Sequence, residues 1–131
     1  METVEFIDLT EELREDPRGF SFYPLKGRAA DPAKLPDAFH LVSIAPGQVR
    51  GNHFHPGRWE WLYPFHGTGI FRWEPQPGDR QERTISGHRL LIRIPPGVAH
   101  SLRNPGPDPI YLLAWREGEA EADETLPRAL D

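Results

Sequence analysis

The chain has 131 residues, enough for one domain with a hydrophobic core of its own. It contains no cysteine, which excludes disulfides and thiolate metal sites, so any metal must be held by imidazole, carboxylate or water. The formal net charge is −5 and no stripe of basic residues is present. This argues against a nucleic-acid partner, because phosphate backbones are bound by clustered Lys and Arg.

No segment of the sequence predicts contact with a membrane. The longest apolar runs are far too short to span a bilayer. The acidic start at residues 1–5 also differs from the positively charged region that opens a signal peptide. We therefore expect a cytoplasmic protein.

Fifteen prolines and twelve glycines interrupt the chain too often for long helices. The segments between them are rich in Val, Ile, Phe, Trp and Tyr, which favours strands. In chain order, the pattern predicts strands at 20–24, 39–44, 51–55, 60–66, 69–74, 81–86, 90–94, 100–104 and 110–116. Short strands separated by turns are typical of an all-β sandwich or closed barrel.

The two ends of the chain are expected to differ from this middle part. Residues 9–15 could form a short helix capped by Asp8 or Thr10, and residues 29–36 are expected to form a loop. We therefore divide the chain into an N-terminal strand and loop segment that packs on the barrel, the barrel itself, and an acidic C-terminal tail, at residues 1–38, 39–116 and 117–131. The tail is expected to be loosely ordered at least to Glu124.

Four residues have the chemistry and spacing of metal ligands. His53 and His55 are two residues apart, so on a strand both imidazoles share a face while Phe54 points away. Glu60 follows a Pro-Gly turn and can return on the neighbouring strand, and His100 comes after a Pro-Pro-Gly turn. Three imidazoles and a carboxylate suit one divalent transition metal such as Zn, Fe, Mn or Ni.

The other histidines have simpler interpretations. A single histidine is usually a hydrogen-bonded core residue, and we interpret His40 and His66 in this way. His66 shares strand parity with Glu60 but lies six residues further on, roughly 20 Å along an extended strand, which is too far to bind the same metal. His88 beside Gly87 is expected to be a solvated turn residue.

The spacing of these residues resembles two sequence motifs of the cupin superfamily. The first cupin motif is matched by Gly47-x5-His53-x-His55-x4-Glu60-x6-Gly67. The second is matched, apart from a leading glycine that Arg89 replaces, by Pro95-x-Gly97-x2-His100-x3-Asn104. The chain is thus identified as a cupin, which implies a jelly-roll β-barrel with a metal inside it.

A narrower resemblance involves nucleotide-sugar enzymes. The segments 50–55, 94–104 and 112–115 are similar to the cupin domain that ends capsular-polysaccharide nucleotide-sugar enzymes. Residues 16–20 also resemble the Asp-x-Arg-Gly segment of deoxysugar epimerases and ketoisomerases. In the ketoisomerase branch the paired histidines do acid–base work without metal, which would make His53 a base. Glu60 and His100 favour the metal-bound interpretation here.

A stripe of aromatic side chains predicts how copies of the chain associate. If Glu60 faces the interior, strand alternation turns four rings outward, at Trp59, Trp61, Tyr63 and Phe65. We expect this stripe to be buried against a second copy of the chain, giving a homodimer; the alternative is cover by the N-terminal strand around Phe20 and Phe22.

Composition and motifs leave several functions open. The favoured one is a metal-dependent enzyme that acts on a small polar substrate, either a sugar or nucleotide-sugar in an isomerase or epimerase reaction, or an oxo acid. Arg50 and Arg103 are candidate substrate-binding residues near the barrel. The catalytic residue is unknown, because Leu62 and Leu102 beside the site are apolar. The alternatives are a non-catalytic module that binds or senses a small ligand, and a metal-dependent dioxygenase.

Overall fold

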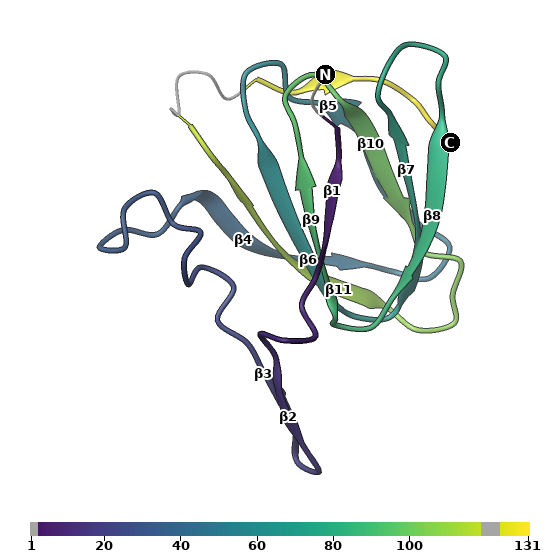
Figure 1. Ribbon diagram of the computed structural model, residues 1–131. Helices are drawn as coiled ribbons and strands as arrows, with labels where there is room; N and C mark the ends of the chain where they lie inside the picture. Colours follow the sequence, from purple (N-terminus) through teal and green to yellow (C-terminus); the bar gives the residue numbers. More distant parts are fainter. Residues whose placement is uncertain (1–2, 119–123) are drawn as a thin grey trace.

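The computed structural model describes residues 3–118 and 124–131, coloured along the chain in Figure 1. Within these residues there is no helix, so none could cross a membrane. The strands are β1 (Glu5–Asp8), β2 (Arg14–Asp16), β3 (Gly19–Ser21), β4 (Asp37–Ile44), β5 (Val49–Phe54), β6 (Glu60–His66), β7 (Thr68–Glu74), β8 (Gln81–Ser86), β9 (Leu90–Ile94), β10 (Ala99–Arg103), β11 (Ile110–Arg116) and β12 (Leu126–Pro127).

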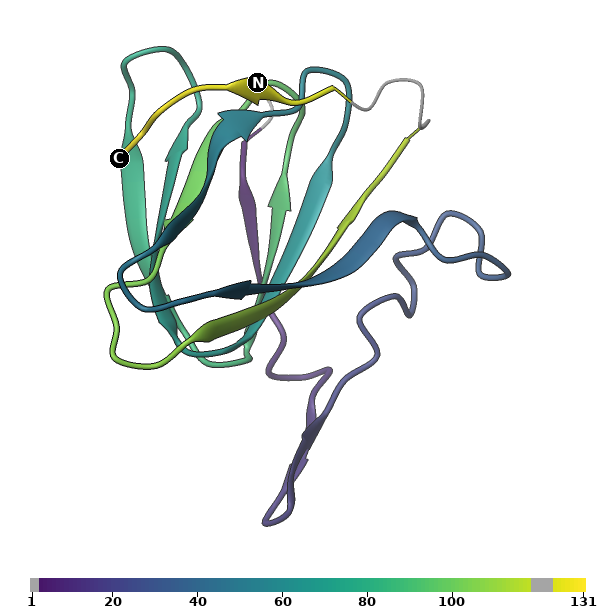
Figure 2. The same cartoon turned by 180° about the vertical axis from the view of Figure 1, so that it is seen from behind.

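Two five-stranded sheets face each other around the interior of the molecule (Figures 1 and 2). One has the order β1-β9-β6-β11-β4 and the other the order β12-β5-β10-β7-β8. The paired strands are antiparallel. The β2–β3 hairpin projects away from these sheets (Figure 2). The all-β class expected from the sequence is confirmed.

The predicted strands agree with the structure through most of the chain. β6, β8, β9 and β11 have the predicted bounds, while β4, β5, β7 and β10 differ by one or two residues at an end. The expected strand at 20–24 is instead the three-residue β3, and β1, β2 and β12 were not predicted. All three missed strands are short, and β1 has acidic residues at its two ends.

The expected helix at residues 9–15 is wrong. Only one turn forms, in which the amides of Glu12 and Leu13 donate to the Leu9 carbonyl at 2.9 and 3.0 Å. Asp8 does cap this turn, because its Oδ1 accepts the Thr10 amide at 2.9 Å. The turn ends because the next residues pair in the β2–β3 hairpin, and a seven-residue helix is too short to persist by itself.

The N-terminal segment covers the middle of the aromatic stripe, at Trp61 and Tyr63. Trp61 and Tyr63 are only 6% and 5% exposed, and they pack in a cluster with Trp115 on the outer face of their sheet. Phe22 and Leu25 from the segment after β3 pack against this cluster. The expectation that Trp61 and Tyr63 need a second copy to bury them is therefore wrong, because the chain already covers them.

The C-terminal residues dock across the end of the second sheet. Residues 119–123, in the tail expected to be loosely ordered, lie outside the described part of the chain. Beyond them, β12 pairs with β5, with Leu126 opposite Phe54. Asn52 anchors the following residues, since its carbonyl accepts the Arg128 amide at 2.8 Å and its Oδ1 accepts the Leu130 amide at 2.9 Å.

A β-bulge in β5 orients the side chains of that strand. His53 pairs with His100 and Gly51 pairs with Ser101, so Asn52 is an extra residue between them. Gly51 and Asn52 both have positive φ, at 95° and 57°. The extra residue breaks the alternation of the strand, so that Arg50 and His53, three residues apart, both face the interior cavity described below.

Gly51 has no room for a side chain. A Cβ at this position would lie 2.7 Å from the His100 carbonyl oxygen, in addition to the backbone strain that positive φ imposes on other residues. We expect Gly51→Ala to lower the free energy of unfolding by at least about 2 kcal/mol in urea titrations.

The matched control is Gly78→Ala, where φ is +86° but no atom lies within 4 Å of the new Cβ. This variant has the backbone strain without the clash. Equal destabilisation of both variants would contradict the close approach of β5 and β10.

Candidate functional site

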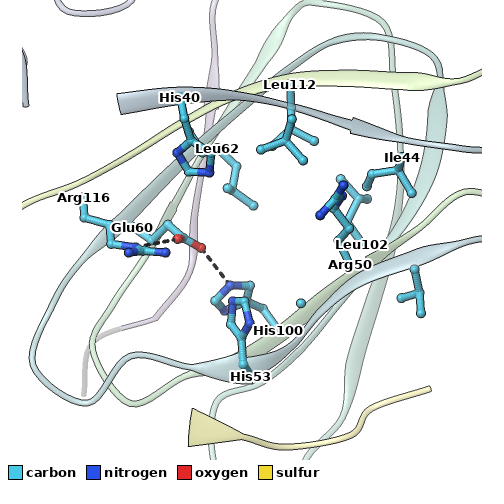
Figure 3. A pocket seen from close by; sticks show the side chains of 14 residues that line it. His40, Ile44, Arg50, His53, Glu60, Leu62, His100, Leu102, Leu112 and Arg116 are labelled. Atoms are coloured by element: carbon cyan, nitrogen blue, oxygen red, sulfur yellow. Dashed lines mark hydrogen bonds and ion pairs between the residues drawn. The ribbon is translucent and has the colours of Figure 1, made fainter. Parts of the chain in front are cut away.

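A cavity of about 380 Å³ opens between the two sheets (Figure 3). Much of its wall is apolar, including Val42, Ile44, Leu62, Leu102 and Leu112. Polar side chains gather on one side of it, at His40, His53, Glu60, His100 and Arg116. The cavity thus combines an apolar wall with a small polar cluster, as small-molecule sites do.

The structure brings the four predicted ligands together. Their ligand atoms all lie within 4.8 Å of one another, and among the described residues they are the group that could hold a metal ion. His53 belongs to β5, His55 follows it, and Glu60 and His100 lie on β6 and β10. The bulge in β5 and the start of β6 therefore place the residues of both motifs at one point.

The protonation pattern of the histidines fits metal ligation. His100 Nδ1 lies 3.1 Å from the Val98 carbonyl oxygen, which can only accept, so Nδ1 carries the proton. In neutral His100 the lone pair is then on Nε2, which faces Glu60 Oε1 at 2.9 Å. A proton on Nε2 makes this contact a hydrogen bond to Glu60, and a metal ion bound to Nε2 would take the place of that proton. Backbone contacts of this kind commonly orient metal-binding histidines.

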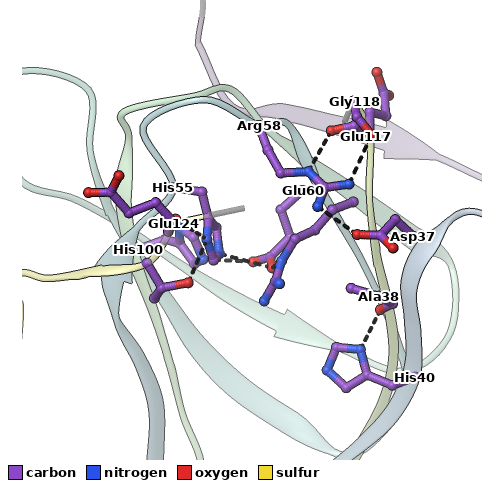
Figure 4. Close-up of polar contacts among 12 residues, drawn as sticks. Asp37, Ala38, His40, His55, Arg58, Glu60, His100, Glu117, Gly118 and Glu124 are labelled. Carbon is purple, nitrogen blue, oxygen red and sulfur yellow. Dashed lines mark hydrogen bonds and ion pairs between the residues drawn. The ribbon is translucent and has the colours of Figure 1, made fainter. Parts of the chain in front are cut away.

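His55 repeats this arrangement on the other side of Glu60. Its Nδ1 contacts Thr125 Oγ1 at 3.1 Å and the Glu124 carbonyl at 3.3 Å, and its Nε2 lies 3.1 Å from Glu60 Oε2 (Figure 4). Despite that approach, the buried Nε2 makes no aligned hydrogen bond within the described residues. Such a nitrogen fits a metal ion, which would bind the lone pair that no donor reaches.

The electrostatics of the site act on the protonation of Glu60 and His53. Burial acts to raise the pKa of Glu60, but its contacts with His100 and His55 outweigh burial and hold that pKa well below its usual range. Burial lowers the pKa of His53 to about 4, and the charge of His100 acts in the same direction. Glu60 is thus ionised and His53 neutral at pH 7.

Two arginines that the sequence analysis did not single out support the site. Arg116 Nε lies 3.2 Å from Glu60 Oε2 and lines the cavity. Arg58 is 1% exposed; its guanidinium donates to Asp37 Oδ2 at 2.6 Å and to the carbonyls of Glu117 and Gly118 at 3.0 and 3.1 Å (Figure 4). Arg58 thereby ties the start of β4 to the end of β11, beside Glu60.

The two predicted substrate-binding arginines have different positions. Arg50 lines the cavity, and its Nε donates to the Ser43 carbonyl at 2.8 Å. Arg103 is exposed at the end of β10 and is not among the residues that line the cavity. Leu62 and Leu102 do line it, as apolar neighbours of the ligand set.

The remaining histidines correct several expectations. His66 lies outside the ligand cluster, as expected, but it is exposed and bonded to the Pro109 carbonyl at 3.0 Å, so its expected core position is wrong. His40 is exposed and lines the cavity, so the expected core position is wrong. Its parity with Val42 and Ile44 was the signal that could have found it. His88 lies in a turn, as expected, but it is half-buried and stacks on Phe20 with 3.9 Å between the ring centroids.

Comparison with solved structures shows the same fold in nucleotide-sugar enzymes. The 3,4-ketoisomerase QdtA from Thermoanaerobacterium thermosaccharolyticum, solved in complex with TDP, is 20% identical with a TM-score of 0.73, over 96% of this chain and 88% of that one. The 3'-monoepimerase ChmJ from Streptomyces bikiniensis, in complex with dTDP-quinovose, is 16% identical with a TM-score of 0.68, over 93% of this chain and 68% of that one.

A third similar structure is the capsular polysaccharide assembling protein CapF from Staphylococcus aureus, 24% identical with a TM-score of 0.60 over 72% of this chain. The chain covers 27% of CapF, so it corresponds to only part of that protein. No curated protein matches the sequence. Residues 15–125 match the family described as the polysaccharide biosynthesis C-terminal domain. Because this match spans most of the chain, and the similar structures are cupins, the protein belongs to the polysaccharide biosynthesis C-terminal domain family of the cupin fold.

Proposed function

We propose that the protein is a metal-binding enzyme that isomerises or epimerises a nucleotide-linked keto-sugar. The observation that carries the proposal is the convergence of His55 Nε2, His100 Nε2 and both Glu60 oxygens beside the cavity, with His55 Nε2 lacking an aligned hydrogen bond. Buried groups of this kind are costly unless a cation joins them.

The residues that would hold the metal are His53, His55, Glu60 and His100. Imidazole and carboxylate donors suit Zn, Fe, Mn or Ni. When bound, such an ion polarises a carbonyl oxygen and makes the neighbouring C–H more acidic. Arg116 contacts Glu60 and would hold its carboxylate in the orientation that ligation requires.

The cavity supports a sugar nucleotide as the substrate class. Its apolar wall, with Ile44, Leu102 and Leu112, would accept the less hydroxylated face of a deoxysugar. Arg50 on the same cavity supplies a guanidinium of the kind that recognises a diphosphate. Structures of similar fold have been solved with TDP-4-keto-6-deoxyglucose and dTDP-quinovose.

We expect purified protein to bind close to one divalent metal per chain, measured by elemental analysis after reconstitution with Zn, Mn, Fe and Ni. His53→Ala, His55→Ala and His100→Ala should each weaken binding by roughly 100-fold or more, because even groups that only orient a ligand contribute about 10- to 100-fold. Circular dichroism should show that these variants remain folded.

His66→Ala is the control for that series, because His66 is exposed and outside the ligand cluster. Its metal affinity should equal that of the unmodified protein. Metal loss in this variant, or unchanged affinity in any of the other three, would remove the assigned residue from the site.

Calorimetric titration of metal-loaded protein tests the substrate class. We expect TDP-4-keto-6-deoxyglucose to bind better than millimolar, and Arg50→Ala to weaken that binding about 10- to 100-fold through loss of a charged hydrogen bond. Arg103→Ala should have the smaller effect, because Arg103 does not line the cavity. Tighter binding of small oxo acids than of any nucleotide sugar would favour an oxygenase or a ligand-binding module.

A homodimer remains our expectation, on a different surface from the covered stripe. β4 is an edge strand of its sheet, and Leu41 on β4 is 73% exposed. Exposed edges with apolar side chains favour pairing with another chain. Sedimentation velocity should show a dimer at micromolar concentration that Leu41→Lys shifts toward monomer; a monomeric unmodified protein would contradict this.

A further inference from the structure

The cavity contains one titratable group outside the ligand cluster. Of the described residues that line it, His53, Glu60 and His100 belong to that cluster. Arg50 and Arg116 remain protonated at any accessible pH and cannot act as bases. The remaining lining residue with a side chain that can serve as a base is His40 on β4.

The tautomer of His40 is fixed by its backbone contact. His40 Nδ1 lies 2.5 Å from the Ala38 carbonyl oxygen (Figure 4). A carbonyl oxygen can only accept, so Nδ1 is the protonated nitrogen. In the neutral ring the lone pair is therefore on Nε2, the nitrogen that the Ala38 contact leaves available to a ligand.

An irregularity in β4 produces this contact. The register between β4 and β11 shifts between Ala114 and Arg116, which pair with His40 and Asp37. Ala38 lies in this bulge with φ of +53°, a conformation that non-glycine residues rarely adopt. Strained bulges of this kind often orient functional side chains. Here the bulge directs a carbonyl toward the His40 ring.

The ring projects from β4 into the cavity, on the side where Glu60 and Arg116 lie (Figure 3). His40 is also exposed, so a proton on its ring can exchange with water. His53, Glu60 and His100 form one part of the cavity wall, and His40 belongs to another strand. A substrate between them would have His40 on one side and the ligand cluster on another.

We propose that His40 is the catalytic base of this cavity, which removes a proton from a carbon next to the carbonyl of a nucleotide-linked keto-sugar. The inference rests on the proposed function. Nε2 forms an N–H bond as the C–H bond breaks, and the electron pair moves to the carbonyl oxygen to give an enolate. Protonation of the same carbon on its opposite face completes epimerisation. In isomerisation the proton is added to the former carbonyl carbon, while the hydroxyl proton on the neighbouring carbon passes to the former carbonyl oxygen, and neither route needs an oxidant.

The test measures by NMR the rate at which metal-loaded protein incorporates solvent deuterium into TDP-4-keto-6-deoxyglucose. The variant is His40→Asn, whose amide can still donate to the Ala38 carbonyl but has no basic nitrogen. General base catalysis is worth about 10²- to 10⁴-fold, so exchange should slow at least 100-fold. Metal content and calorimetric affinity for TDP should remain unchanged.

His66→Asn is the matched control, because His66 is also exposed and also bonds a backbone carbonyl through Nδ1, but lies outside the cavity. This variant should incorporate solvent deuterium into the sugar at the same rate as the unmodified protein. Added imidazole should restore exchange in His40→Ala if the ring acts as a base and not as a positioning group.

The outcomes separate the two proposals. Exchange in the unmodified protein that persists in His40→Asn overturns the role of His40 and leaves the proposed function intact. No exchange in the unmodified protein, although the sugar binds, overturns both. ¹⁵N-histidine NMR of the protein without metal or substrate gives a measurement that is independent of activity. His40 should show a protonated Nδ1 and an unprotonated Nε2. The opposite tautomer would overturn the inference.

Discussion

The buried carboxylate of Glu60 is the group on which the site depends. It lies 2.9 Å from His100 Nε2 and 3.1 Å from His55 Nε2, and it is ionised because contacts with these rings outweigh the effect of burial on its pKa. Each ring has its other nitrogen at a carbonyl or hydroxyl. The ionised carboxylate is therefore held by protons on these rings, or by a divalent cation that binds Nε2 of each ring in place of a proton.

Two β-bulges then determine which side chains share the cavity with this carboxylate. In β5 the extra residue Asn52 places both Arg50 and His53 toward the interior. In β4 the bulge at Ala38 directs a carbonyl to His40. Both bulges contain non-glycine residues with positive φ, at Ala38 and Asn52. The backbone strain in this fold is therefore concentrated in the strands that line the cavity.

The sequence predicted the parts that depend on local pattern. Strand alternation and turn residues were enough to predict the bounds of β6, β8, β9 and β11. Motif spacing was enough to predict that Glu60 and His100 lie beside the paired histidines. Contacts between distant segments could not be predicted in this way. The burial of Arg58 by Asp37 and Gly118 needs the tertiary structure. The cover of Tyr63 by Phe22 was one of two alternatives that the sequence left open, and only the structure decides between them. The parity of His40 with Val42 and Ile44 predicts its place in the cavity wall, although a core position was expected.

The geometry of Glu60 also bears on which residue could act as a base. The sequence resembles ketoisomerases in which the paired histidines do acid–base work without metal. In this chain the second histidine of the pair, His55, directs its Nε2 at Glu60, and so does His100. A ring whose lone pair faces a carboxylate or a bound cation is not available to a substrate carbon. With His53 as a metal ligand, as proposed, proton transfer would fall to a group outside the ligand cluster, and His40, whose Nδ1 is held by the Ala38 carbonyl, meets that requirement.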